Sequence, residues 1–230
     1  MSEHVGASTR ANQTTSQSGG DGEPTVRPNV AELYLVRHGT TTWNVTNRYR
    51  GRRDVPLDTQ GWADALAAAR QLSPLGLRAV YAGPLQRCID TARVIADECG
   101  IDEVRIDDGF YNLDYGTWEG MTAEEAAARD PEMFARYVAA PLDAACPNGE
   151  RLMDAQDRIV EALLSIGEHH KGERIAGVTH AVMIRLVAAK LLGRRDEGWR
   201  IPVGRGSLTK LEVENGRIRL LREPDGDDVD

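Results

Sequence analysis

The chain of 230 residues is long enough for one α/β domain with a sizeable core. A hydrophobic share of 41% and a charged share of 28% are ordinary for a globular protein, and no apolar run reaches the ~20 residues that would span a bilayer. The formal net charge is −8, of which residues 223–230 carry −5 and residues 1–29 carry −1. The body is therefore nearly balanced, which argues against a nucleic-acid-binding protein, because such a protein needs a basic excess.

Two terminal segments are expected to lie outside the folded domain. Residues 1–29 are rich in Ser, Thr, Asn, Gln and Gly, and they have too little apolar surface to offset the entropy of ordering, so a disordered leader is expected. The acidic residues 223–230 predict a disordered tail. No basic segment followed by an apolar one marks a secretory signal, so the cytoplasm is the expected location.

Residues 30–222 alternate strand and helix signals. Short apolar runs predict strands at 33–36, 79–81, 104–106 and 175–179. Helical spacing and capping residues predict helices at 60–73, 85–99, from 122 onward, at 150–168 and at 182–193. The pair Asn215-Gly216 between residues 207–213 and 217–221 predicts a hairpin. We therefore expect a three-layer α/β fold, with a mostly parallel central sheet, helices on both faces and an antiparallel edge hairpin.

Three cysteines and a pair of histidines were considered as special sites. Cys88, Cys99 and Cys146 have neither the spacing of a metal site nor that of a disulfide framework, and buried thiols are expected. His169 and His170 are adjacent on a helix and diverge in direction, so a surface helix end is expected rather than a metal site.

Reactive side chains follow several of the predicted strands. Arg37 and His38 come directly after the first strand, Arg87 follows the second by a few residues, and His180 follows a late one. In a parallel sheet the carboxyl ends of the strands meet at one edge, where ligands bind. Each residue alone is more often structural or solvated, but their convergence indicates a site.

Two histidines and two arginines at one sheet edge form a cationic, hydrogen-bonding cup. The planar guanidinium of arginine matches the oxygens of a phosphate or carboxylate, and a histidine can act as a nucleophile near neutral pH. Such a cup suits phosphoryl transfer, in which the catalyst positions the group and stabilises charge on its oxygens.

The chain resembles the histidine phosphatase superfamily in its phosphoglycerate-mutase-like branch. The resemblance runs from about residue 32 to 221, in order, through residues 35–44 (LVRHGTTTWN), 50–61 (RGRRDVPLDTQG), 84–92 (PLQRCIDTA), 115–120 (YGTWEG), 148–150 (NGE) and 178–185 (VTHAVMIR). An Arg-His-Gly triplet alone would be weak evidence, whereas this ordered set is specific.

The resemblance implies a role for each matching residue. His38 would be the nucleophile that becomes phosphohistidine, while Arg37, Arg87 and His180 would bind the phosphoryl oxygens. The substrate site would also include Asn44, Arg50, Gly51 and Ala181. The family needs no metal or cofactor, and none is expected here. Residues 112–150 would form a small helical cap over the pocket, where the substrate is selected.

Four positions depart from the family pattern, and one of them concerns the chemistry. Thr40 stands where Glu or Gln is usual, Gly83 where Ser is common, and Ala181 where Gly is usual. Asn112 stands where the family has the glutamate that protonates the leaving oxygen. An amide has no proton to give at neutral pH, and the loss of a general acid typically costs ~10²–10⁴-fold in rate.

Three outcomes for the missing acid remain open. Asp114, two residues further on, is a candidate substitute acid, because residues two apart in a strand share a face. The substrate could instead carry a good leaving group that needs little protonation. In the third outcome the protein binds a phosphorylated ligand and turns it over poorly.

The sequence thus predicts a metal-independent phosphomonoesterase acting on a small phosphorylated metabolite, in residues 30–222. A phosphoglycerate-type mutase and a phospho-ligand-binding module are the alternatives. Four arginines, Arg48, Arg50, Arg52 and Arg53, follow the nucleophile loop and are either a solvated loop or extra affinity for an anionic substrate. Dimers are common in the family, so a homodimer is among the expectations.

Overall fold

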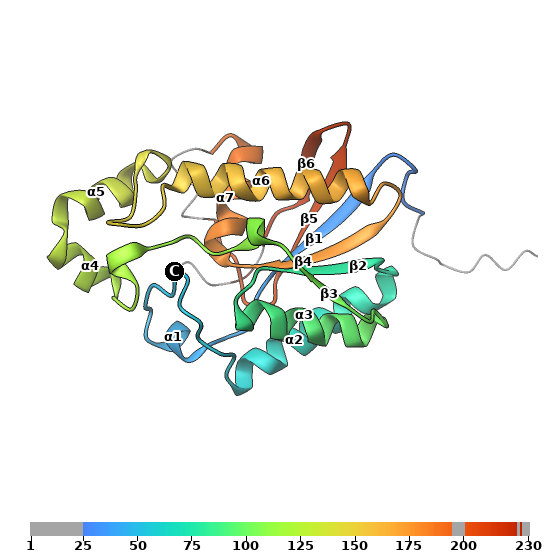
Figure 1. Cartoon of the computed structure of the whole chain (residues 1–230), viewed down its shortest axis with the longest axis horizontal. Helices are drawn as coiled ribbons and strands as arrows, with labels where there is room; N and C mark the ends of the chain where they lie inside the picture. Colours follow the sequence, from blue (N-terminus) through green and yellow to red (C-terminus); the bar gives the residue numbers. More distant parts are fainter. Residues whose placement is uncertain (1–24, 195–200, 225, 227–230) are drawn as a thin grey trace, which may run out of the picture.

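A single mixed sheet organises the chain, for which the computed structural model describes residues 25–194, 201–224 and 226 (Figure 1). Its six strands lie in the order β3-β2-β4-β1-β5-β6. The first four strands in that order are mutually parallel, and β5 and β6 are antiparallel to their neighbours. The strands are β1 (Ala31–Arg37), β2 (Ala79–Ala82), β3 (Val104–Ile106), β4 (Arg174–Thr179), β5 (Leu208–Glu214) and β6 (Arg217–Arg222).

Helices cover both faces of this sheet (Figure 1). One face carries α2 and α3, and the other carries α6 and α7. The helices are α1 (Thr42–Val45), α2 (Thr59–Leu72), α3 (Gln86–Cys99), α4 (Ala123–Arg129), α5 (Pro131–Ala139), α6 (Leu152–His169) and α7 (Ala181–Leu192), with short 3₁₀ turns at Ser73–Leu75, Asp108–Phe110, Gly116–Trp118 and Pro141–Asp143. The prediction of a three-layer α/β fold with an antiparallel edge hairpin is therefore confirmed.

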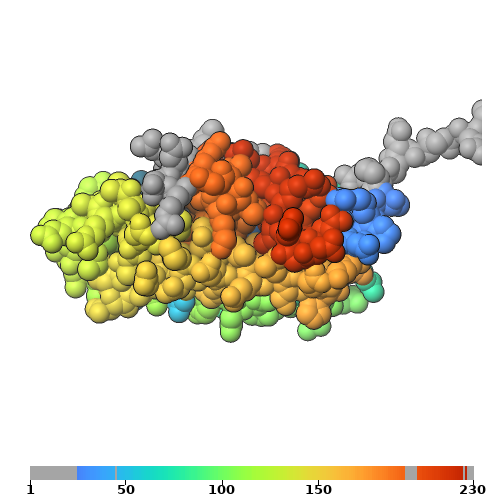
Figure 2. Space-filling model, turned by 90° about the horizontal axis from the view of Figure 1, so that it is seen from above, coloured from blue at the N-terminus to red at the C-terminus, as the bar shows by residue number. Residues whose placement is uncertain are grey.

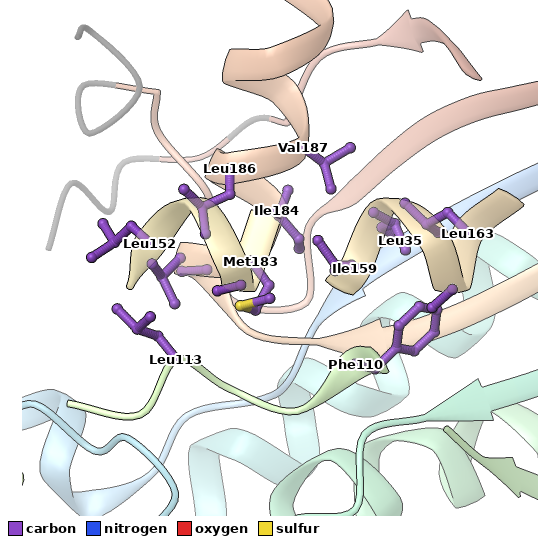
Figure 3. Close-up of a cluster of buried hydrophobic side chains, with 14 of the residues drawn as sticks. Leu35, Phe110, Leu113, Leu152, Ile159, Leu163, Met183, Ile184, Leu186 and Val187 are labelled. Atoms are coloured by element: carbon purple, nitrogen blue, oxygen red, sulfur yellow. The ribbon is translucent and has the colours of Figure 1, made fainter. Parts of the chain in front are cut away.

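The two faces of β1 show how the sequence builds these layers. Leu33 and Leu35 belong to the core beneath α6 and α7, whereas Tyr34 and Val36 belong to the core beneath α2 and α3. The strand is buried on both faces, which is why it reads as a continuous apolar run. Figure 3 shows the first core, with side chains from α6 and α7 packed against Leu35 and Phe110.

Most predicted elements lie within two residues of their expected bounds. Helix α3 is followed by its C-cap Gly100, which adopts a φ of 68°. The hairpin turns through Asn215 and Gly216, whose φ values are 50° and 70°. Left-handed conformations of this kind favour Gly and Asn, so the local signals were strong. One expectation was wrong in part: Cys88 and Cys146 are buried free thiols, but Cys99, in the last turn of α3, is half-buried.

The predicted cap contains α4 and α5, which lie at one end of the sheet (Figure 1). Thr122 and Glu125 form the expected capping box at the start of α4. Trp118 is fully buried and its Nε1 donates to Asp130 Oδ2 at 2.8 Å, which joins the start of the cap segment to the residue between α4 and α5. Figure 2 shows α6 along one face of the molecule, with the cap at one end of it and the β5–β6 hairpin beside its other half.

The terminal segments and the His169-His170 pair complete the comparison with the sequence. The predicted leader falls mostly on residues 1–24, and most of the predicted tail on residues 225 and 227–230, all outside the described residues. The expectation for His170 was wrong: α6 ends at His169, and His170 is buried with its Nδ1 2.6 Å from Glu173 Oε2 and its Nε2 3.0 Å from the Tyr81 hydroxyl.

No helix within the described ranges has both the length and the apolar character needed to cross a membrane.

Candidate active site

The carboxyl ends of β1 and β4 and the first turn of α3 bring the predicted residues together. Arg37 is the last residue of β1 and His38 follows it, with the His38 amide donating to Thr179 O at 3.0 Å. His180 follows β4 directly and is the N-cap of α7. Arg87 is the second residue of α3, after β2. The four side chains are buried, with at most 2% of their surface exposed.

His38 is held with one ring nitrogen protonated. Its Nδ1 lies 2.7 Å from the carbonyl oxygen of Gly39. A carbonyl can only accept a hydrogen bond, so Nδ1 carries the proton and Nε2 keeps its lone pair. The lone pair on Nε2 is what a nucleophile requires.

His180 stands beside His38 in the opposite tautomer. The two ring centroids are 5.1 Å apart and meet edge to face. Arg87 Nη2 lies 3.4 Å from His180 Nδ1, which must accept because a guanidinium only donates. The remaining N–H is then at Nε2, which lies 3.5 Å from the sulfur of Cys88.

Burial and positive charge keep both histidines neutral. Burial, followed by the charges of Arg87, Arg50 and Arg37, lowers the pKa of His38 well below its ordinary value, against a smaller opposite effect of the Gly39 carbonyl. Burial and the charge of Arg87 likewise lower the pKa of His180 well below its ordinary value. A neutral imidazole is the form that attacks phosphorus.

The cup offers hydrogen-bond donors that have no partner within the described part of the chain. Arg87 uses Nη1 on Arg53 O at 2.7 Å and Nη2 on Gly51 O at 2.9 Å, while its buried Nε has no partner there. Asn44 Oδ1 accepts from the Thr41 amide at 2.8 Å, and its buried Nδ2 has no partner either. Unsatisfied buried donors are costly, and a bound anion would supply the partners that these two donors lack.

Close backbone packing explains the glycine after His38. A Cβ atom added at Gly39 would lie 2.1 Å from Gly61 O, and the Gly39 amide donates to Thr91 Oγ1 at 3.2 Å. The Thr91 hydroxyl in turn donates to Arg87 O at 2.8 Å. The loop that carries His38 is thereby fixed to both α2 and α3.

The four arginines of residues 48–53 separate into two groups. Arg48 pairs with Glu125 at 2.9 Å, Arg52 with Glu150 at 3.4 Å, and Arg53 with Glu119 at 3.6 Å. These three serve mainly to join the loop to the cap. Arg50 is half-buried, and its charge acts on both active-site histidines. Sequence analysis left two interpretations of this loop, a solvated loop and extra affinity for an anionic substrate. Arg50 is the arginine whose charge is in a position to serve the second.

Asn112 and Asp114 lie at different depths beside the cup. Asn112 is buried, and its Nδ2 donates to Gly51 O at 2.9 Å. Asp114 is half-buried, accepts from the Gly116 amide at 2.8 Å and lies 3.7 Å from Arg52 Nη1. Both carboxylate oxygens of Asp114 thus have partners of their own.

Local packing accounts for two of the other departures from the family pattern. Thr40 donates from its amide at 3.0 Å and from its hydroxyl to the same Oδ2 of Asp64, which a longer side chain at this position would not do in the same way. A Cβ added at Gly83 would lie 2.5 Å from Phe110 O, so this backbone contact requires glycine. Ala181 is buried at the start of α7, next to His180.

Sequence reasoning missed several residues that support the cup. Cys88 and Thr91 lie in the motif at 84–92 but were given no role, although they contact His180 and Gly39. Val203 was missed entirely: its carbonyl accepts from Arg37 Nη1 at 2.5 Å. A contact made by a backbone oxygen leaves no mark in the sequence, since any residue could supply it. No group of three or more His, Cys, Asp or Glu that could hold a metal ion occurs in the part of the chain that the structure describes.

This geometry agrees with the comparison to known proteins. The chain belongs to the histidine phosphatase superfamily (branch 1), whose family model matches residues 33–225. It is 34% identical over 200 residues to phosphoglycerate mutase-like protein 4 of Arabidopsis thaliana, covering 86% of this chain and 81% of the relative. It is 30% identical over 194 residues to phosphoserine phosphatase 1 of Hydrogenobacter thermophilus, covering 84% of this chain and 92% of the relative.

A solved structure of the same architecture supports the assignment. The chain superimposes on Bacillus stearothermophilus YhfR with a TM-score of 0.79 at 33% sequence identity, covering 87% of this chain and 100% of that one. The family resemblance expected from the motifs is thus confirmed, and phosphatase chemistry is the activity that the family and the site have in common.

Proposed function

We propose that this protein is a metal-independent phosphomonoesterase that hydrolyses a small organic phosphate through a phosphohistidine on His38. One observation carries the proposal: a neutral His38, unprotonated at Nε2, lies within the electrostatic influence of Arg87, whose buried Nε has no hydrogen-bond partner among the described residues. Phosphatases among the similar proteins, including phosphoserine phosphatase 1, support the same reaction class. A phosphorylated metabolite is the expected partner.

The reaction would proceed in two balanced steps. His38 Nε2 attacks phosphorus in line, an N–P bond forms, and the P–O bond to the alcohol breaks as that oxygen takes the electron pair and a proton. Water then attacks phosphorus, the N–P bond breaks and inorganic phosphate leaves. Arg37, Arg87 and His180 would hold the non-bridging oxygens in both steps, because donors already in place stabilise the transition state without reorganisation.

The source of the leaving-group proton is the open part of this proposal. Asn112 cannot supply it, because an amide is not an acid at neutral pH. Asp114 is the carboxyl group that the sequence suggests as a replacement, and its contacts with Gly116 and Arg52 would have to rearrange for it to act. A substrate whose leaving group is a weak base would need no acid at all.

Phosphate release from two kinds of ester tests the proposal. 4-Nitrophenyl phosphate has a leaving group that barely needs protonation, while phosphoserine and 3-phosphoglycerate have leaving groups that need it strongly. We expect hydrolysis to fall to the background rate in His38→Ala and to stay near the wild-type rate in the matched control His169→Ala, whose ring lies on the exposed end of α6.

Each pattern of results has a distinct meaning. Activity on both classes that Asp114→Asn reduces for the alkyl esters alone would assign the acid to Asp114. Activity on the aryl ester alone would favour a substrate with a good leaving group. Isomerised phosphoglycerate without free phosphate would indicate a mutase, and tight phosphate binding without turnover of any ester would indicate a binding module and overturn the proposal.

A further inference from the structure

Arg158, on α6, makes an unusually complete set of contacts next to the active site. Its Nε and Nη2 donate to Glu150 Oε1 and Oε2, each at 3.0 Å, so the two side chains form a bidentate pair. Both are largely buried, with side-chain exposures of 23% and 14%. A planar guanidinium paired in this way is fixed in orientation as well as in position.

The rest of the Arg158 guanidinium holds the backbone that leads to Asn112. Nη1 donates to the carbonyl oxygens of Asp108 at 3.2 Å, Gly109 at 2.9 Å and Tyr111 at 3.0 Å. Nη2 also lies 3.4 Å from Asn112 O. One side chain therefore binds four carbonyl groups of a single loop, and no ordinary surface ion pair requires that.

Glu150 forms hydrogen bonds with the other end of the same loop, at Asp114. Its amide donates to Asp114 O at 2.9 Å, and its Oε2 accepts from the Asp114 amide at 3.4 Å. The backbones are in close contact here, because a Cβ added at Gly149 would lie 2.3 Å from Asp114 O. This explains the Asn-Gly-Glu motif at 148–150, to which the reaction assigns no role.

The network continues into the loop of residues 48–53. Glu150 Oε2 lies 3.4 Å from Arg52 Nη2, and Arg52 is next to Gly51. The carbonyl oxygen of Gly51 accepts from Arg87 Nη2 and from Asn112 Nδ2, each at 2.9 Å. Arg158 and Glu150 are thus joined through short contacts to an arginine of the cup, although neither belongs to it.

We propose that Glu150 and Arg158 are positioning residues, which fix residues 111–114 against the phosphoryl-binding cup so that the leaving group is held in line for attack by His38. The inference rests on the proposed phosphatase function. It adds to that function by naming the two residues that hold the segment next to the leaving group in place. Neither side chain is proposed to touch the reacting atoms.

Substitutions that break the bidentate pair of Arg158 and Glu150 test this proposal. Arg158→Lys keeps the positive charge but cannot bind Glu150 and four carbonyl groups together, and Glu150→Gln keeps the size but not the charge. We expect each to lower kcat at least ~10-fold with KM changed less than ~2-fold, because small misplacements of a reacting group cost rate rather than affinity. Amide hydrogen exchange should speed up at residues 108–117 and not in β1 or β4.

Two variants serve as matched controls. Arg93→Lys changes an exposed arginine that pairs with Asp90, and Glu168→Gln changes an exposed glutamate that pairs with Lys171. Both should keep wild-type kcat. Far-UV circular dichroism equal to that of wild type would show that Arg158→Lys and Glu150→Gln are folded. If either fails to fold, the double variant Arg158→Gln/Glu150→Gln, which removes both charges, replaces them.

The possible failures can be told apart. If the wild type hydrolyses ester while kcat and local exchange in the variants match those of the controls, the positioning role is overturned and the phosphatase function stands. If the wild type hydrolyses neither class of ester, the phosphatase function fails, and the exchange measurement alone decides whether the pair fixes residues 108–117. Loss of protection spread evenly over the whole sheet would also overturn the inference, because it would show a general structural role.

Discussion

Arg87 and Asn112 donate to one oxygen, the carbonyl of Gly51, at 2.9 Å each. The arginine that is expected to hold the phosphoryl group and the amide at the expected position of the family acid therefore share a partner. The amide ties the neighbouring segment to the cup, whereas an ionised carboxylate at the same place would face the carbonyl oxygen and be repelled. At the position where the family resemblance implies an acid, Asn112 thus makes a structural hydrogen bond and has no acidic proton to give.

This relationship predicts the effect of restoring the acid. In Asn112→Glu the carboxyl group lies against the Gly51 carbonyl, which favours the protonated form because only that form can donate to it. We expect kcat/KM for alkyl phosphates to rise by ~10²-fold relative to 4-nitrophenyl phosphate. Asn112→Gln, with the same length and no acid, should leave the ratio unchanged. An equal ratio in the two variants would contradict the prediction.

Arg87 should be irreplaceable by lysine. Its guanidinium binds two carbonyl groups, those of Arg53 and Gly51, and its Nε has no partner among the described residues. A single ammonium cannot match this set of donors. We expect Arg87→Lys to lower kcat/KM for 4-nitrophenyl phosphate by ~10²–10³-fold. The same change at Arg93, one and a half turns further along α3 and exposed, is the control. Similar rates for the two variants would remove Arg87 from the proposed machinery.

The pH dependence of catalysis should report the charge of Arg50. Its positive charge is among the causes that lower the pKa of His38, so Arg50→Gln should raise that pKa. The nucleophile is active when neutral, and the acidic limb of kcat/KM against pH should therefore move to higher pH in the variant. Arg53→Gln, in the same loop but paired with Glu119, is the comparison. The idea fails if the limb of Arg50→Gln stays where the wild-type limb lies.

The same buried histidines should make stability depend on pH in a defined direction. The pKa values of His38 and His180 are lowered in the folded protein, so below pH ~6.5 these histidines bind protons in the unfolded chain but not in the folded one. The folded state is therefore destabilised as the pH falls. Their contribution is complete above that pH and is lost as the pH falls toward the folded values, by up to ~1.4 kcal/mol per pH unit for each histidine. Urea unfolding at pH 7.5 and 5.5 measures it, and His180→Gln should show the smaller difference.

Gly39 should tolerate no side chain, for a steric reason. An added Cβ would meet the carbonyl oxygen of Gly61 at 2.1 Å, and neither backbone can withdraw easily. We expect Gly39→Ala to lower the free energy of unfolding by about 3 kcal/mol and to lower activity as well. Gly100→Ala is the control, because a Cβ added there meets nothing within 4 Å. Its left-handed φ of 68° alone should lower the free energy of unfolding by about 1 kcal/mol. Equal losses in thermal or urea unfolding would show that the close contact is relieved elsewhere.

The predictable part of this fold consists of local signals. The apolar run of β1, the glycine that ends α3 and the Asn215-Gly216 turn each act over a few residues, so periodicity and turn chemistry locate them. The main residues of the site could also be predicted, because Arg37 ends a strand and His38 and His180 directly follow strands, and the ends of these strands must meet at one edge.

What escaped prediction depends on contacts between distant segments. His170 follows a helix and looks exposed in the sequence, but it is buried against Tyr81 and Glu173 because β4 begins just beyond it. Arg158 is a single arginine in a helix, and nothing near it in the sequence shows that a loop 46–50 residues away places four carbonyl groups around it. The partners of Asp114 were hidden for the same reason.

The outer strand of the sheet has a consequence for how copies of the chain meet. β6 is mostly exposed and carries arginines at 217, 219 and 222, and the opposite outer strand, β3, has just three residues. A second copy that added its own β6 in antiparallel register would bring guanidinium groups face to face, and β3 offers too short a ladder to compensate. Sheet extension into fibres is thereby discouraged at both margins.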